Sequence, residues 1–264
     1  MKKLAAALAA IAVLAASSVT QAGVVLVQKE SVTGFGQPRT NERTLMIQGN
    51  KEKMVSATHQ VITDLDKGVM YIVYPDRKIY LEMPFPPSGP MAKAIGKPAF
   101  HGADFKKTGK THTVAGYKCE EYTGAGKVQS GEFTVNECVS ASVPGASEFL
   151  AFESHMNKAL KGSAYDMSSG HKVPHGIPLS QKASTKVTNL SIPNLSPKDA
   201  ARIQQELKNR PPIISTVEVE KITVQNLPTS TFEVPQGYTK QQLPAGMLGQ
   251  GPASGAPTSP APKK

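Results

Sequence analysis

Two cysteines are the residues of this chain whose chemistry is easiest to predict. Cys119 and Cys138 are its only thiols. They do not form a C-x-x-C motif, which a dithiol redox centre would require. The chain opens with an apolar leader typical of exported proteins, and exported chains meet an oxidising compartment in which disulfides persist. We therefore predict a structural disulfide between them; two free buried thiols are the alternative.

Other patterns that carry known chemistry are incomplete. His171 and His175 have the spacing of metal ligands on a helix, but Pro174 lies between them in a segment typical of a loop. The stretch 109–111 (GKT) resembles the end of a phosphate-binding loop, yet Asp104 occupies the position of its first glycine. No G-x-S-x-G or H-E-x-x-H motif is present. We predict no catalytic residue, no metal site and no cofactor.

The first 22 residues have the three parts of a signal peptide. Lys2 and Lys3 supply positive charge, residues 4–16 are apolar, and small residues precede a cleavage position after Ala22. The apolar run is shorter than the roughly 20 residues that a membrane-spanning helix needs. We expect a periplasmic or secreted protein with no transmembrane segment after signal cleavage.

The charge of the mature chain is moderately basic. Loss of Lys2 and Lys3 with the signal peptide lowers the formal net charge from +10 to +8. There is no run of five basic residues and no interleaving of basic and aromatic residues of the kind that binds single strands. A nucleic-acid partner is therefore not expected, and composition gives no indication of the oligomeric state.

Alternating and fully apolar segments predict a β-rich domain. Before residue 84 they form an antiparallel meander, with a two-residue turn at Gly49-Asn50. In the last long strand, the apolar side chains change from odd-numbered to even-numbered positions. A bulge near residues 220–221 would keep them on the same face of the sheet. Five prolines within residues 84–105 indicate a long loop. The predicted strands are 24–27, 44–48, 51–56, 60–65, 69–74, 78–83, 111–122, 132–139, two short strands within 176–189, and 213–224.

The cysteines also predict a register between two strands. If Cys119 lies directly opposite Cys138, the centre of the hairpin falls between Val128 and Gln129. The surrounding stretch, residues 124–131, contains three glycines, which favours a turn there.

Two amphipathic helices are expected, at residues 147–161 and 197–209. Ser196 can cap the second helix, with Pro197 at its first position. The first helix carries an apolar stripe of the kind that usually packs into a core. The same stripe could instead line an apolar ligand cavity. Its side chains are Phe149, Phe152 and Met156.

Three segments together resemble a known family. They are MYIVYPDRKIYLEM (70–83), VAGYKCEEY (114–122) and TFEVPQGY (231–238). They are similar to a family of exported bacterial proteins classed as a domain of unknown function, which looks related to the outer-membrane lipoprotein carrier fold. The resemblance implies an α+β fold, in which a curved antiparallel β-sheet (half-barrel) holds the two main helices on its concave side. It implies no reaction, because the family has no established one.

The expected organisation follows from these observations. Residues 1–22 form the signal peptide, residues 23–242 form a single half-barrel-like domain, and residues 243–264 form a disordered tail rich in Pro, Gly, Ala and Ser.

A curved sheet covered by helices has a natural apolar cavity between its layers. We therefore expect a non-catalytic binding or carrier protein for a lipid, a lipidated partner or another apolar ligand. A structural or assembly protein of the cell envelope is the first alternative, and a hydrolase is the second. A cavity between the sheet and the helices would favour a carrier. A large exposed apolar patch would favour an assembly protein. A cleft that holds clustered acidic residues would favour a hydrolase.

Overall fold

The computed structural model describes residues 22–34, 36–88, 103–128, 131–163, 166, 174–188 and 196–242. Its strands form one twelve-stranded sheet in the order β12-β6-β5-β4-β3-β2-β1-β11-β10-β9-β8-β7. Every neighbouring pair is antiparallel except β12 and β6, which are parallel. In chain order the elements are β1 (Gly23–Thr33), β2 (Arg39–Gln48), β3 (Lys51–Val55), β4 (Gln60–Asp64), β5 (Val69–Tyr74), β6 (Ile79–Pro84), β7 (Lys106–Val114), β8 (Tyr117–Val128), β9 (Gly131–Ser140), α2 (Ala146–Leu160), β10 (Ile177–Val187), α3 (Pro197–Asn209), β11 (Ile213–Gln225), the 3-10 helix η1 (Thr229–Phe232) and β12 (Thr239–Gln241).

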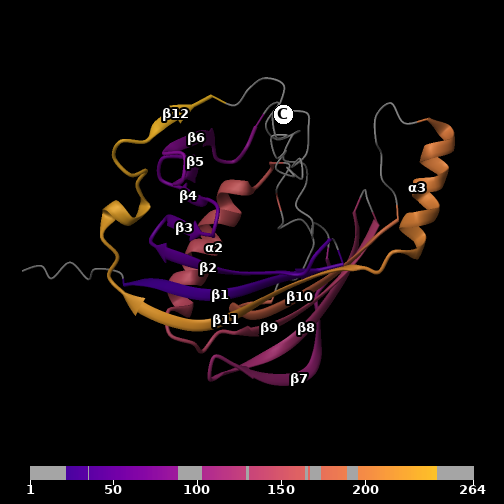
Figure 1. Cartoon of the computed structure of the whole chain (residues 1–264). Coiled ribbons are helices and arrows are strands. Elements are labelled where there is room, and N and C mark those ends of the chain that lie inside the picture. Colours follow the sequence, from indigo (N-terminus) through magenta and orange to yellow (C-terminus); the bar gives the residue numbers. More distant parts are fainter. Residues whose placement is uncertain are drawn as a thin grey trace, which may run out of the picture.

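Two runs of sequence-adjacent strands meet at the centre of this sheet. The meander β1 to β6 joins the run β7 to β11 through the long pairing of β1 with β11. In Figure 1, β1 and β11 cross the view while β3 to β6 are seen nearly end-on, so the sheet twists strongly across its width. The predicted α+β class, with a large and mostly antiparallel sheet and two main helices, is confirmed.

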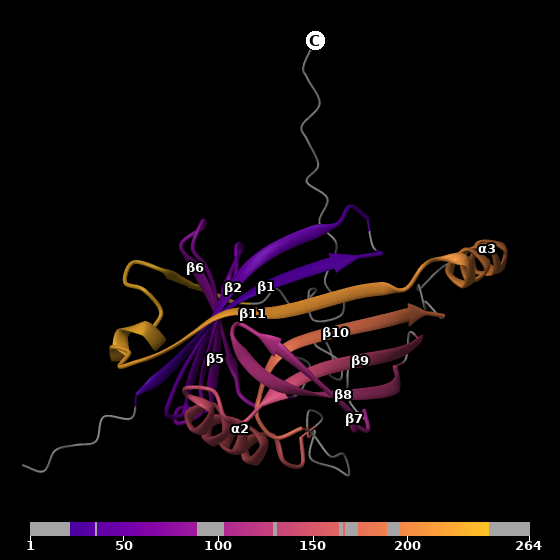
Figure 2. The same ribbon diagram turned by 90° about the horizontal axis from the view of Figure 1, so that it is seen from below.

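Helix α2 packs against one face of the sheet, over β1, β2 and β10 (Figure 2). The backbone N–H of Gly49 in the β2–β3 turn donates to Glu148 at its start, and His155 contacts Asn50 of the same turn. Phe149 and Phe152 of its apolar stripe are buried in this interface. The sheet residues that share this apolar cluster include Val24, Leu26, Ile47, Ile177, Leu179 and Val219.

Helix α3 takes a different position. Both views place it beyond the ends of β10 and β11 and away from α2 (Figures 1 and 2). Ser196 caps it as predicted, with Oγ accepting a hydrogen bond of 3.2 Å from the Asp199 N–H. The expectation that both helices pack on the concave side is therefore not met by α3. Among the α3 side chains whose burial is described, Leu207 alone is buried, and so narrow an apolar stripe does not hold a helix along a sheet.

The last described segment covers the opposite face of the sheet. Leu227 and Phe232 are buried in a second apolar cluster with Ile62 and Val73. The side-chain amide of Gln48 fixes this segment, donating to the Leu227 carbonyl at 3.1 Å and accepting from its N–H at 2.7 Å. Helix α2 and this segment thus pack on opposite faces of the sheet.

Two predicted strand assignments are wrong. Residues 111–122 are not one strand but the end of β7, a turn at Ala115-Gly116 and the start of β8. Both turn residues have positive φ, 51° and 82°, as a two-residue hairpin turn requires. The segment 176–189 holds one strand, β10, whose pairing with β9 is interrupted between Pro178 and Ser180.

Other local predictions are confirmed or need correction. The bulge in β11 is present, because Val27 pairs with Lys221 and Gln28 with Val219, which leaves Glu220 as the extra residue. The hairpin register was wrong by two positions, since Cys138 pairs with Glu121 rather than with Cys119. Pairing continues to Val128 and Gly131, so most of the glycine-rich stretch is strand.

Several predicted features lie outside the described residues. These are residues 1–21 of the signal peptide, the tail 243–264, His171, Gln129 and residues 89–102 of the proline-rich segment. Within the described part, no helix combines the length and apolarity needed to cross a membrane.

Candidate functional site

Three glutamates on three elements are linked electrostatically around α2. Glu153 is on α2, Glu52 on β3 and Glu137 on β9, and the charges of Glu137 and Glu52 both act on Glu153. All three side chains are partly buried. We call these three residues the acidic cluster.

Burial changes the acidity of this cluster. It raises the pKa of Glu153 to about 7, and the charges of Glu137 and Glu52 add to the effect. Burial also raises the pKa of Glu52 to about 7, against an opposing influence of Arg43. The pKa of Glu137 is raised by burial as well, although a hydrogen bond from Gln181 counteracts it. Near neutral pH the cluster is therefore only partly ionised.

Polar side chains of the central strands extend the cluster. The Arg43 Nε on β2 donates to Gln28 on β1 at 2.9 Å, and Gln28 is only 5% exposed. The Gln181 amide on β10 donates to Glu137 at 2.5 Å. These groups can offer both donors and acceptors to a polar ligand group.

A groove of about 460 Å³ runs along α2 beside the acidic cluster. Glu153 is the member of the acidic cluster that lines this groove. Its described lining residues are Leu150, Glu153, Ser154, Asn157, Lys158, Lys161 and His175.

The side chains predicted to line an apolar cavity lie on the inner side of α2. Phe149 and Phe152 are 7% and 2% exposed, and Met156 is partly buried against the same apolar cluster. In this structure the three side chains act as core. They lie on the same helix as Glu153, one of them directly before it in sequence.

The predicted disulfide is present. Cys119 and Cys138 are bonded, with their Cα atoms 5.3 Å apart, and both are buried beside the α2 cluster. No free cysteine exists among the described residues.

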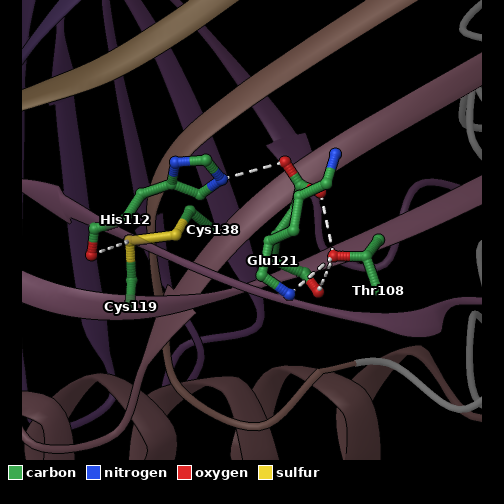
Figure 3. A network of polar contacts seen from close by, with 6 residues as sticks. Thr108, His112, Cys119, Glu121 and Cys138 are labelled. Atoms are coloured by element: carbon green, nitrogen blue, oxygen red, sulfur yellow. Dashed lines mark hydrogen bonds and ion pairs between the residues drawn. A yellow bond between two sulfur atoms is a disulfide. The ribbon is translucent and has the colours of Figure 1, made fainter.

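A polar network on the β7–β8 hairpin lies beside the disulfide (Figure 3). Glu121 accepts from the Thr108 hydroxyl at 2.9 Å and contacts His112 Nε2 at 3.0 Å. The hydrogen bond from Thr108, followed by that from His112, lowers the pKa of Glu121. Because the carboxylate binds both groups, His112 is not placed as a base on the Thr108 hydroxyl, and the network is not a nucleophile–base pair.

The described residues include one member of the histidine pair suggested by spacing. His175 lines the groove and is exposed, while His171 lies outside the described residues. Among the described residues no group of three or more His, Cys, Asp or Glu side chains is arranged to hold a metal ion.

Sequence reasoning missed the acidic cluster. Glu52, Glu137 and Glu153 are far apart in the chain, and none belongs to a recognisable motif. The one available signal is weak: Glu153 directly follows a residue of the apolar stripe of α2, at the edge of its buried face.

Some solved structures are similar to this chain. PNGF-II matches 86% of it at 10% identity with a TM-score of 0.40, and the chain spans about a third (32%) of PNGF-II. A DUF1329 family protein from Desulfovibrio piger matches 82% of the chain and 91% of its own length, at 10% identity and a TM-score of 0.31. A LolA superfamily protein from Nitrosomonas europaea matches 81% and 90%, at 10% identity and a TM-score of 0.29. With TM-scores below 0.5, nothing about activity follows from these likenesses.

No curated protein is significantly similar to this chain. The family described as Domain of unknown function (DUF4412) matches residues 35–182, which is more than half of the chain. This match includes two of the three segments whose resemblance was noted in the sequence. The chain belongs to the DUF4412 family.

Proposed function

We propose that this protein is an exported, non-catalytic binding protein that carries a lipid or another amphiphilic ligand at the interface of α2 and the sheet. The observation that carries the proposal is that one helix, α2, carries both Phe149 and Phe152 of the apolar cluster and the partly buried Glu153, whose pKa burial raises to about 7. Burying carboxyl groups costs stability, so a fold that needed only a core would not gain from them here.

The two parts of the interface suit the two parts of an amphiphile. An acyl chain would contact Phe149, Phe152 and Met156, which now fill the space under α2. A polar head group would lie in the groove and accept or donate hydrogen bonds at Glu153 and its neighbours. For the acyl chain to enter, α2 has to move relative to the sheet.

The cellular setting is part of the proposal. The leader ending at Ala22 would export the chain, residues 23–242 would form the binding domain, and the residues after 242 would remain a tail. The disulfide supports this setting, because such bonds persist in oxidising compartments.

Native mass spectrometry of protein taken from its own periplasm, before and after delipidation, tests the proposal. We expect an added mass that delipidation removes, and binding of a fluorescent acyl probe to the stripped protein. Met156→Lys should weaken probe binding by about tenfold, because it places a charge in the acyl path, while Lys158→Ala should not. If the protein carries no lipid and binds no acyl probe, the proposed carrier function is wrong.

A hydrolase is the second candidate, and one specific observation favours it. Burial raises the pKa of Glu153, which lines the groove, to about 7, and a carboxyl with such a pKa suits general acid or base catalysis near neutral pH. Turnover of glycoside or ester substrates that is lost in Glu153→Gln, with the fold retained, would support this candidate over a carrier.

A structural or assembly role in the cell envelope has less support. Val224, 42% exposed, is the single large apolar side chain that the described part leaves exposed. It forms no patch for a protein partner.

A further inference from the structure

The groove along α2 is formed by one side of the helix and by a residue of another segment. Its residues on α2, with the C-cap Lys161, recur at spacings of three and four positions, which places them on one side of the helix. His175, in the segment that leads into β10, lines the same groove.

The backbone beside His175 is held against the sheet. The next residue, Gly176, has a φ of 144°, and a Cβ added to it would lie 2.7 Å from the carbonyl oxygen of Ser140 at the end of β9. Ile177 then begins β10 and pairs with Ser140. His175 therefore reaches the groove from the sheet and not from the helix.

The polarity of the helix side changes along its length. Leu150 is apolar and partly buried, Ser154 and Asn157 are neutral and polar, and Lys158 and Lys161 are cationic and exposed. From Leu150 to Lys161 the distance along a helix is about 16 Å. An elongated ligand on this side would meet an apolar side chain at one end and two cations at the other.

The groove carries more positive than negative charge. Lys158 and Lys161 are opposed by Glu153, the one acid among its described lining residues. Burial raises the pKa of Glu153 to about 7, so its carboxyl is only partly ionised near neutral pH. Asp166, which follows the helix, is not among those lining residues and accepts from the Gly162 N–H at 2.8 Å. The groove therefore attracts anions.

Both lysines are available to a ligand. Within the described part of the chain, neither forms an ion pair, whereas Lys107 on β7 is paired with Glu120 at 2.7 Å. Lysines at the end of a helix also offset its dipole. That role requires neither a groove nor a histidine from another segment, so it does not account for the whole arrangement.

The donors of the groove suit a phosphate group. Two ammonium groups, an imidazole, the Asn157 amide and the Ser154 hydroxyl can all donate hydrogen bonds. A phosphate has more acceptor oxygens than a carboxylate, and lysine is a common phosphate ligand. The volume of about 460 Å³ is within the range of ligand pockets.

We propose that the groove on α2 binds a phosphate group, held by Lys158 and Lys161 together with His175. This inference rests on the proposed carrier function for the source of that phosphate, which would be the head group of an anionic lipid. The lipid would lie with its phosphate at the C-terminal end of α2 and its apolar part towards Leu150.

Calorimetric titration of the delipidated protein from the periplasm tests the phosphate site. The probes are a short-chain phosphatidic acid, the uncharged diacylglycerol with the same acyl chains, and inorganic phosphate, with both lipids below their critical micelle concentrations. We expect the wild type to bind the phosphatidic acid at least about tenfold more tightly than the diacylglycerol, because the charged groups add hydrogen bonds.

Two variants locate the source of this preference. Lys158→Glu/Lys161→Glu should abolish it, and His175→Ala should weaken phosphatidic acid binding by about threefold, while both bind the uncharged diacylglycerol as the wild type does. The matched control is Lys198→Glu/Lys208→Glu, which makes the same change of charge at exposed positions of α3. It should retain the preference for the phosphatidic acid.

Inorganic phosphate distinguishes the two sources of the group. Binding at least about tenfold weaker than that of the phosphatidic acid supports a lipid head group, since the acyl chains then add affinity. Equally tight binding that is lost in Lys158→Glu/Lys161→Glu supports a site for free phosphate.

A wild type that does not prefer the phosphatidic acid and binds no inorganic phosphate would overturn the phosphate site. The same preference in Lys158→Glu/Lys161→Glu would also overturn it. Binding of the diacylglycerol in either case would leave the carrier function standing. Conversely, if inorganic phosphate binds at the lysines and neither lipid binds, the phosphate site stands and the carrier function is wrong.

Discussion

Glu153 binds its proton more tightly in the folded protein than in the unfolded chain. Burial raises the pKa of its carboxyl from the ordinary 4.5 to about 7. A carboxyl whose pKa is raised by folding makes its full contribution to stability when the pH is below its pKa in the unfolded chain. This contribution is lost as the pH rises through the pKa of the folded state. The buried cluster therefore weakens the fold between about pH 4.5 and about pH 7.

Glu153→Gln should remove most of this penalty. We expect the variant to be more stable than the wild type by about 2 kcal/mol at about pH 8 and nearly equal to it at about pH 4.5. Denaturant unfolding at the two pH values measures the difference. Glu233→Gln, at an exposed position, should change little at either pH. Equal effects of Glu153→Gln at both pH values would contradict the assigned burial.

Glycines of the β8–β9 hairpin have packing roles that composition does not reveal. The Cα of Gly131 faces the neighbouring strand so closely that an added Cβ would lie 2.0 Å from the Lys186 carbonyl oxygen. At Gly124 the nearest atoms, at 3.2 Å, belong to the side chains of Phe105 and Val135. A backbone atom cannot move as a side chain can.

Gly131→Ala should therefore cost more than Gly124→Ala. We expect a loss of about 3 kcal/mol of unfolding free energy for the first and about 1 kcal/mol for the second, since overpacking costs more where the neighbour is rigid. Equilibrium urea unfolding gives both values. A Gly124→Ala variant as unstable as Gly131→Ala would show that the hairpin packs differently.

At the scale of elements, the disulfide joins the neighbouring strands β8 and β9. Cys119 and Cys138 are 19 positions apart, so the bond closes a moderate loop in the unfolded chain. The positions are not directly opposite, which means that the strand register does not depend on the bond alone.

Replacing both cysteines with alanine should lower the unfolding free energy by about 3 kcal/mol, chiefly by freeing the unfolded chain. Unfolding of the double variant and of the oxidised wild type, compared in the same buffer, measures the loss. Alkylation of the unreduced wild type should label neither thiol. A labelled thiol, or an unchanged stability, would contradict a bridge that holds β8 to β9.

At the scale of the whole molecule, the last segment closes one edge of the sheet. Strand β12 pairs with β6, the Thr239 N–H donates to Lys78 at 3.0 Å, and Lys240 lies 2.9 Å from Glu82. An uncovered edge strand is a template for pairing with another chain.

A chain ended after Tyr238 should therefore self-associate as its concentration rises, because β6 becomes an open edge. A chain ended after Gln242 retains β12 and is the matched control. Light scattering coupled to size exclusion, over a range of concentrations, distinguishes them. If both truncated chains have the same mass at every concentration, β12 does not protect the edge.

The sequence by itself determined most of the local structure. The bounds of α2 and α3, the Ser196 cap and the bulge at Glu220 were predictable, because helix periodicity, capping and strand alternation depend on neighbouring residues. The Ala115-Gly116 turn escaped prediction, since alanine rarely adopts a positive φ.

Only the tertiary structure decided which elements and side chains are neighbours. The pairing of β1 with β11, and the influence of Glu52 and Glu137 on Glu153, join residues far apart in the chain. The position of α3 away from α2 is likewise a matter of tertiary structure. No local pattern encodes these relations, because they depend on sheet order and on where a helix is laid down. The chemistry of the site has the same origin: a glutamate is an ordinary acid in the sequence, and its pKa rises to about 7 only when distant elements exclude water from it.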